Sequence, residues 1–285
     1  MIDLHTHSTA SDGTLTPREV VLLAAAQGLS AVALTDHDTA AGNAEALDAG
    51  REAGIRVIPG IEMSAVWEGT EIHILGYFAD PDDDGLTADL SWFRDRREER
   101  NDIILDNLAE DGILITREEL TGGNPDTVIT RAHFAKVLMD RGLVRDRKAA
   151  FDSYLAEGGR YVPPKEGLTP EAVMELFRIH RIWPCLAHPV QYHLDDRAFS
   201  RLLDELIPQG LRGLEVWYTS HSFSSTSILQ RTARIRGLIP TGGSDFHGSS
   251  KPDIKIGTGF GNLKIRDEVL DAVEKDYLRI FPPED

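Results

Sequence analysis

The chain has 285 residues, of which 41% are hydrophobic and 27% charged, and its formal net charge is −17. The length allows one large α/β domain or two smaller ones. The acidic excess argues against broad electrostatic attraction to nucleic acid or to anionic membranes. We find no apolar run long enough to span a bilayer and no signal-peptide pattern, and we expect a cytoplasmic protein. The single cysteine, Cys185, excludes a disulfide framework and a cysteine-based zinc site.

The first part of the chain alternates short apolar segments with helical patterns. Strands are predicted over residues 2–4, 31–35, 57–61 and 72–78. Thr16, Pro17 and Glu19 mark the start of the first helix as a capping box with proline at its first position. A second helix is predicted over residues 43–53. This alternation is typical of parallel strands joined by crossover helices.

The pattern changes after residue 85, where helical segments replace strands. We predict a helical insertion domain over residues 99–166 that forms a lid over the active site, flanked by barrel segments 1–98 and 167–285. Strand and helix patterns alternate again in the second barrel segment, with strands at 185–187, 213–216 and 238–241. Six or seven strands with interleaved helices favour an α/β barrel over a small open sheet.

Histidines and carboxylates follow these strands. In chain order they are His5, His7, Asp12, His37, Glu62, His188, Asp245 and His247. The C-terminal ends of parallel barrel strands open on one face, so we expect these side chains to converge there. His73 is the exception, because it lies inside a strand pattern. An isolated histidine is usually a hydrogen-bonded structural residue, and an aspartate after a strand is often a helix cap, so the prediction rests on the whole set.

Imidazole and carboxylate together suit Mn, Fe, Co or Zn, whereas magnesium prefers a shell of oxygen ligands and water. The set is too large for one ion and suits two or three ions with open positions. Such ions would hold a phosphate despite the acidic chain. They would also activate a bridging hydroxide to attack phosphorus and stabilise charge on the attacking and leaving oxygens.

The motifs resemble the polymerase and histidinol phosphatase (PHP) family. The segments that carry the resemblance are Asp3-Leu4-His5-Thr6-His7-Ser8, Ser11-Asp12-Gly13, Thr35-Asp36-His37-Asp38, Gly60-Ile61-Glu62, Ala187-His188-Pro189 and Gly243-Ser244-Asp245-Phe246-His247. The resemblance implies a distorted (β/α)7 barrel and a phosphoesterase site with up to three metal ions, with Mn²⁺ expected and Zn²⁺ or Fe²⁺ as alternatives. It implies the ligand set His5, His7, Asp12, His37, Glu62, His73, His188, Asp245 and His247.

Within this family, the chain is most similar to stand-alone bacterial members that act on nucleoside 3′,5′-bisphosphates, some of which also trim RNA 5′ ends. The helical insertion and Thr130-Arg131-Ala132-His133-Phe134 carry this similarity, with Ala132 where the family usually has proline. The predicted substrate is therefore a nucleotide such as 3′-phosphoadenosine 5′-phosphate, which would give AMP and phosphate. Neither a membrane nor a protein partner is implied.

The predicted substrate contacts come from the insertion and are Arg100, Asn101, Arg131, His133 and Lys165. His221, just after a predicted strand, is the candidate catalytic residue that protonates the leaving alkoxide.

Three alternatives remain at this point. A 5′-3′ exonuclease would act on short RNA or DNA, although the net charge of −17 disfavours a long nucleic-acid track. A histidinol-phosphate phosphatase would not need two separated anion sites. In a non-catalytic module the metals would only support the barrel, and each coordination shell would be closed.

Overall fold

A computed structural model of the protein describes residues 1–124, 127–163 and 168–283. Its seven-stranded sheet has the order β1-β2-β3-β4-β5-β6-β7. The strands are β1 (Ile2–Asp3), β2 (Ala31–Leu34), β3 (Arg56–Trp67), β4 (Thr70–Tyr77), β5 (Trp183–Leu186), β6 (Gly213–Tyr218) and β7 (Ile239–Gly243). The Leu4 amide donates to the Gly242 carbonyl at 3.2 Å, which brings the two ends of the sheet together. The sheet is a nearly closed barrel, and the predicted fold class is confirmed.

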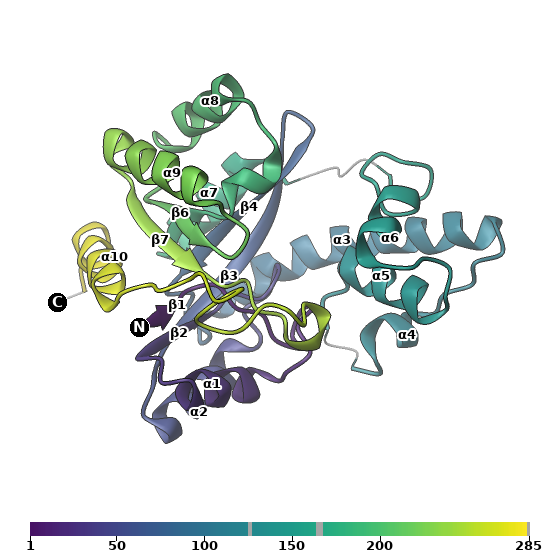
Figure 1. The fold of residues 1–285 in the computed structure, drawn as a ribbon, viewed down its shortest axis with the longest axis horizontal. Helices are drawn as coiled ribbons and strands as arrows, with labels where there is room; N and C mark the ends of the chain where they lie inside the picture. The colour runs from purple at the N-terminus through teal and green to yellow at the C-terminus, as the bar shows by residue number, and fades with distance from the viewer. Residues whose placement is uncertain (125–126, 164–167, 284–285) are drawn as a thin grey trace.

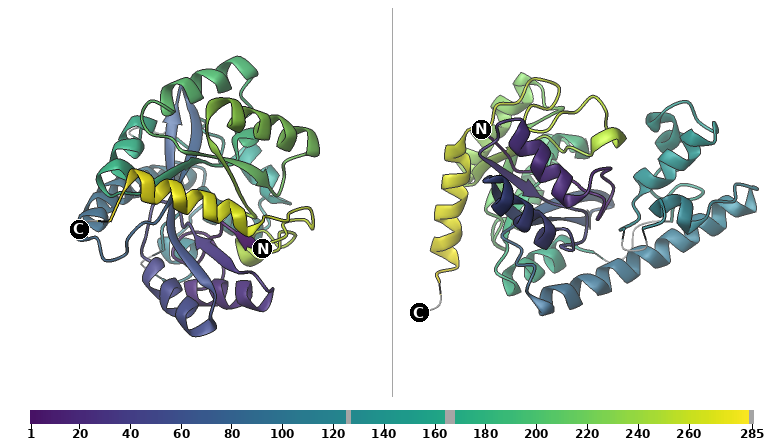
Figure 2. Two further views of the ribbon diagram at one scale, coloured as in Figure 1. Left: turned by 90° about the vertical axis from the view of Figure 1, so that its left-hand side faces the viewer. Right: turned by 90° about the horizontal axis from the view of Figure 1, so that it is seen from below.

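Helices surround the barrel and close one end of it (Figure 1). Those packed around the sheet are α1 (Pro17–Ala26), α2 (Asn43–Ala53), α7 (Pro170–Ile179), α8 (Asp196–Leu206) and α9 (Phe223–Arg236). Helix α10 (Asp267–Ile280), which the sequence patterns did not predict, lies across the end near the chain N-terminus (Figure 2). None of the helices within the described residues combines the length and apolar character that crossing a membrane requires.

Strand β4 runs antiparallel to both of its neighbours, whereas the alternating pattern of the first part of the chain is typical of parallel strands. The chain turns back after Trp67, and His73 of β4 lies opposite Ser64 of β3. The His73 carbonyl accepts a hydrogen bond from the Ala187 amide at 3.0 Å, directly beside His188. Because β4 is reversed, a residue near its beginning reaches the barrel end that the other strands reach at their C-termini. This explains why His73 lies inside a strand pattern.

Four helices form a unit beside this end of the barrel (Figure 2). They are α3 (Asp84–Glu110), α4 (Arg117–Thr121), α5 (Arg131–Asp140) and α6 (Arg147–Ser153). The unit has its own apolar cluster, in which Ile104 and Leu108 of α3 pack with Phe134 and Leu138 of α5. The start of α3 instead packs in the barrel cluster through Leu86. The predicted boundary at residue 99 therefore lies inside a continuous helix, which no proline or internal glycine interrupts after Gly85.

Candidate metal-binding active site

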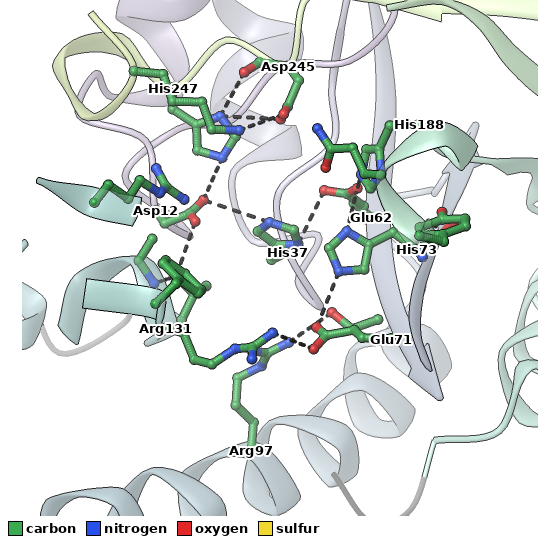
Figure 3. A pocket seen from close by; sticks show the side chains of 18 of the residues that line it. Asp12, His37, Glu62, Glu71, His73, Arg97, Arg131, His188, Asp245 and His247 are labelled. Atoms are coloured by element: carbon green, nitrogen blue, oxygen red, sulfur yellow. Dashed lines mark hydrogen bonds and ion pairs between the residues drawn. The ribbon is translucent and has the colours of Figure 1, made fainter. Parts of the chain in front are cut away.

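The structure brings all nine predicted ligands together at one end of the barrel. Figure 3 labels seven of them, all except His5 and His7. Their ligand atoms form four overlapping groups, within each of which the atoms lie no more than 4.8 Å apart. The groups are His7–Asp12–His37–His247, His5–His7–Asp245, His5–Glu62–His188 and His37–Glu62–His73. His73, which the position after a predicted strand did not identify as a ligand, belongs to the last of these groups.

The backbone around these residues is unusually constrained. His188 and Asp245 have positive φ angles of 20° and 58°, which cost a non-glycine residue free energy and occur mainly at functional sites. Gly243, at the end of β7, lies so close to β1 that a Cβ atom there would be 2.2 Å from the Cβ of His5. Glycine at this position lets the two strands approach and places His5 beside the loop that carries Asp245.

Glu62 lies at the centre of the cluster. Its Oε1 atom is 2.9 Å from both His73 Nδ1 and His188 Nε2. Its Oε2 atom is 3.2 Å from both His7 Nε2 and His37 Nδ1. On the other side of the cluster, Asp12 Oδ1 is 3.1 Å from His247 Nε2. The carboxylates therefore connect histidines from different strands.

The three carboxylates of the cluster are ionised at neutral pH. Burial alone would raise the pKa values of Asp12, Glu62 and Asp245, but the charges of nearby histidines, and of Lys251 for Asp245, hold all three well below the usual range. For His7, burial acts to lower the pKa, but hydrogen bonds to Asp245 and Glu62 outweigh it and raise the pKa to about 9. The raised pKa of His7 shows that the buried carboxylates favour a positive charge beside them, as they would favour a metal cation.

The donor atoms fit divalent metal ions. Among the described residues, Asp12 Oδ1 and His37 Nδ1 are buried without a hydrogen bond. His5 Nε2 and His7 Nε2 lie 3.1 Å apart, a separation that two ligands of one ion can also adopt. Six imidazoles and three carboxylates suit borderline transition metals better than magnesium. The site has the composition and geometry of a metal centre.

A cavity of about 300 Å³ lies over the cluster. All the candidate ligands except His5 and His7 line one wall, and cationic side chains from the helical unit line the other (Figure 3). These cations are Arg97 and Arg100 of α3, Arg131 of α5 and Arg147 of α6. Lys251, which follows β7, also lines the cavity and contacts Asp245 Oδ2 at 2.5 Å. An acidic chain therefore places its cations where an anionic substrate would bind.

Several of these cations pair with carboxylates. Arg97 pairs with Asp38, and its Nη2 atom lies 3.1 Å from Ser64 Oγ. Arg131 contacts Glu71 at 2.7 Å. Arg100 contacts Glu157 at 2.6 Å. Burial, together with the nearby charges of Arg100 and Arg131, lowers the pKa of Arg97 to about 10, so its guanidinium group stays charged at neutral pH.

The predicted substrate contacts have different locations. Arg100 and Arg131 line the cavity, whereas Asn101 and His133 are absent from its lining. The Asn101 amide donates to the Ile129 carbonyl at 3.2 Å, and His133 Nδ1 accepts from the Thr130 amide at 3.0 Å within a capping box. Both have structural partners. Lys165 lies outside the described residues.

His221, the predicted catalytic residue, is also absent from the cavity lining. It is only 5% exposed, and its Nδ1–H donates to the Val216 carbonyl at 2.9 Å. Its catalytic role remains a prediction without support from the cavity geometry. Conversely, the sequence patterns did not single out Arg97, Arg147 or Lys251. Arg97 could have been found from its spacing, because it lies three residues before Arg100 and shares its face of α3.

A nearly closed α/β barrel, with an imidazole–carboxylate cluster at one end and cations across the cavity, defines a metal-dependent hydrolase of an anionic substrate. The family model of the PHP domain matches residues 3–141. The chain is 36% identical over 274 residues to a 5′-3′ exoribonuclease of Haemophilus influenzae, which covers 96% of this chain and 98% of that protein. It is 35% identical to a 3′,5′-nucleoside bisphosphate phosphatase of Chromobacterium violaceum, over 90% of each protein.

A solved structure from Bifidobacterium adolescentis, described as a metal-dependent phosphoesterase, superposes with a TM-score of 0.83 at 30% identity, covering 98% of this chain and 96% of that one. The chain belongs to the PHP family, as its motifs predicted, and is a phosphoesterase.

Proposed function

We propose that the protein removes one phosphate from nucleoside 3′,5′-bisphosphates such as 3′-phosphoadenosine 5′-phosphate. The observation that carries this proposal is the two-walled cavity, with the ligand cluster on one side and Arg97, Arg100, Arg131 and Arg147 on the other. The reacting phosphate would lie at the cluster, and the retained phosphate would lie among the arginines. A volume of about 300 Å³ suits a small-molecule ligand. The similarity to the phosphatase of C. violaceum supports this substrate class.

The nine clustered residues are the proposed ligands of two or three divalent ions, with Mn²⁺ as the expected metal and Zn²⁺ or Fe²⁺ as alternatives. When bound, such ions lower the pKa of water and stabilise charge on phosphoryl oxygens. Glu62 would contribute to two of the four groups and set the spacing between them. Tyr218 donates to Asp245 Oδ2 at 2.6 Å, which would keep Oδ1 directed toward His5 and His7.

The arginines would exchange their carboxylate partners for phosphate oxygens. Planar guanidinium groups bind phosphate through two parallel hydrogen bonds, which fixes its orientation. Glu71 and Glu157, the partners of Arg131 and Arg100, also lie at this side of the cavity and would be displaced. Residues 99–166, together with Arg97 on the preceding turn of α3, would in this way act as a lid that closes on substrate.

The H. influenzae relative favours a second candidate, a 5′-3′ exonuclease acting on short RNA. The same cluster would then hydrolyse a phosphodiester, and the arginines would hold the 5′-terminal phosphate. Only a few cations are needed for a short oligonucleotide, so the net charge of −17 is compatible with this activity.

The test compares three substrates with Mn²⁺-loaded protein: 3′-phosphoadenosine 5′-phosphate, histidinol phosphate and a 5′-phosphorylated RNA tetramer. The proposal predicts rapid, metal-dependent phosphate release from the bisphosphate and none from histidinol phosphate. Asp245→Ala serves as the control for contaminating phosphatases. Faster turnover of the tetramer would establish the exonuclease instead, and turnover of histidinol phosphate alone would contradict both candidates.

A further inference from the structure

Glu215 lies in the middle of β6, and its side chain is fully buried beside the candidate metal centre. It belongs to none of the four ligand groups. Its Oε1 atom is 3.0 Å from His5 Nδ1, and its Oε2 atom is 2.7 Å from the backbone nitrogen of His188. One carboxylate therefore contacts two candidate ligands, which come from the segment after β1 and from the loop after β5.

Both partners of Glu215 act as donors, because the oxygens of a carboxylate accept hydrogen bonds. The His188 contact is a backbone N–H, which is always a donor. The His5 contact therefore requires a proton on Nδ1, which leaves Nε2 free to bind a metal ion. Nε2 points into the cluster, where it lies 3.3 Å from Glu62 Oε2 and 3.6 Å from Asp245 Oδ1.

The second contact acts on the backbone of His188. This residue has φ 20° and ψ 57°, a conformation that is costly for a residue with a side chain. The hydrogen bond from its amide to Glu215 helps to hold the turn, and the turn directs His188 Nε2 to Glu62 Oε1 at 2.9 Å. Glu215 thus orients the ring of one ligand and the backbone of another.

We propose that Glu215 is a positioning residue that controls binding of one particular ion of the cluster. His5 and His188 are together only in the group His5–Glu62–His188, and His5 belongs in addition to His5–His7–Asp245. The group His7–Asp12–His37–His247 contains neither of them. Loss of Glu215 should therefore weaken metal binding at the group His5–Glu62–His188 and leave the group His7–Asp12–His37–His247 largely intact. This inference rests on the metal assignment of the proposed function but not on its substrate.

Glu215→Gln tests the inference with little change in volume. Glutamine has one acceptor and one NH₂ donor, so it cannot accept from both partners. If its oxygen keeps the His188 amide, its NH₂ group faces His5 Nδ1 and forces the ring proton onto Nε2. We expect one ion to bind about 10–100-fold more weakly than in the wild type, as is usual when the outer partner of a ligand is lost. Mn²⁺ titration followed by electron paramagnetic resonance, with metal analysis of the dialysed protein, measures this change.

Asp276→Asn is the matched control at the other end of the barrel. Asp276 is also a buried carboxylate, and it accepts from Trp183 Nε1 at 2.9 Å and from Arg212 Nε at 2.8 Å. Its loss should lower the melting temperature without changing the number of Mn²⁺ ions bound. Unchanged binding in Glu215→Gln, or the same loss of ions in both variants, would overturn the inference. A wild-type protein that binds no ions would instead contradict the proposed function.

A second measurement uses the wild-type protein and does not depend on the folding of a variant. In Zn²⁺-loaded protein labelled with ¹⁵N-histidine, we expect the His5 signals to show a protonated Nδ1 and a metal-bound Nε2. The variant His5→Gln assigns these signals. Metal coordination through Nδ1 of His5 would overturn the proposed role of Glu215.

Discussion

The two walls of the cavity are built in different ways. On the barrel wall, most candidate ligands lie on loops that follow strands, and Glu62 and His73 lie within β3 and β4. Backbone hydrogen bonds fix the loops. The Asp245 amide, for example, donates to the His5 carbonyl at 2.9 Å, and the Glu62 amide donates to the Asp36 carbonyl at 3.0 Å. On the helical wall, the arginines extend on long side chains and make ion pairs with Asp38, Glu71 and Glu157.

This difference separates two tasks. Metal ligands must keep fixed distances and a dry environment, which buried strand ends provide. Substrate contacts must form and break in each catalytic cycle, and an arginine that exchanges one anion for another can do so at low cost. We therefore expect changes on the barrel wall to affect metal content and activity together. Changes on the helical wall should affect substrate binding and leave the metal content unchanged.

The largest effect is expected for Glu62→Gln. The Glu62 oxygens lie 2.9–3.3 Å from ring nitrogens of His5, His7, His37, His73 and His188. Replacing this carboxylate should remove metal and reduce kcat/KM by ~10³-fold, which corresponds to about 4 kcal/mol of transition-state stabilisation. Metal analysis and phosphate release measure the two losses, with Glu68→Gln in the exposed hairpin turn as the control. Loss of activity with full metal content would contradict the expectation that changes on the barrel wall affect metal content and activity together.

A smaller effect is expected for Arg97→Gln, and its neighbour Arg96 provides a matched control. Arg97 lines the cavity, whereas Arg96 is exposed and pairs with Glu99 on the same helix. A charge-assisted hydrogen bond contributes about 1.5–3 kcal/mol, so kcat/KM should fall by roughly 10–100-fold in Arg97→Gln. Steady-state kinetics should show no more than about a twofold change for Arg96→Gln, since exposed ion pairs contribute little. A loss of metal in Arg97→Gln would contradict the expectation that changes on the helical wall leave the metal content unchanged.

Thr130, the N-cap of α5, connects the helical wall to the barrel wall. Its hydroxyl donates to Asp12 Oδ2 at 3.1 Å, so it connects the helical unit to a candidate ligand. Thr116 caps α4 with the same capping-box geometry and is exposed. Thr130→Ala and Thr116→Ala should each destabilise the protein by about 1 kcal/mol through loss of a cap.

Thr130→Ala alone should also weaken Mn²⁺ binding, by about tenfold, because it removes an outer partner of Asp12. Thermal unfolding and Mn²⁺ titration separate the two effects, and Thr130→Ser should restore both. Equal Mn²⁺ affinity in the two alanine variants would show that the walls are not coupled through this hydroxyl.

The smallest effect concerns the place where α3 leaves the barrel. His180 Nδ1 lies 2.7 Å from Asp83 Oδ2, and Nε2 lies 2.9 Å from Asp89 Oδ2. Burial acts to lower the pKa of His180, but hydrogen bonds and charges of Asp89 and Asp83 outweigh it and raise the pKa above 6.5. A raised pKa in the folded state stabilises the protein fully below pH 6.5, and this contribution disappears as the pH rises through the folded-state pKa.

His180→Gln should therefore destabilise the protein at pH 6 by about 0.5–1 kcal/mol, and the difference from wild type should shrink toward pH 9. Urea unfolding of both proteins at each pH, with metal held constant, measures this difference. A difference that grows with pH would contradict the sign of the pKa shift.

Most of the candidate metal centre could be predicted because its signals are local. His5 and His7 lie two residues apart after a strand, and Asp245 and His247 repeat this arrangement after the last strand. Any α/β barrel brings such positions to one end. His73 needed the family resemblance, because the direction of β4 depends on its pairing with β3 and β5. Periodicity does not reveal that pairing.

Several contacts of the helical wall could not be predicted from local sequence signals. Asn101 and His133 have the chemistry of substrate contacts, but tertiary packing directs them to the Ile129 carbonyl and the Thr130 amide. In the sequence, Arg97 and Arg147 resemble ordinary surface arginines, and only the packing of α3 and α6 places them at the cavity.

The sequence by itself determined the barrel class and, with the family resemblance for His73, the proposed ligand set, because residue type and distance from a strand end are properties of short segments. Only the tertiary structure decided which cations face the cluster, and which buried carboxylate orients its histidines. Those contacts join residues far apart in the chain, such as Glu215 and His5. Their geometry depends on how the strands and helices pack against one another.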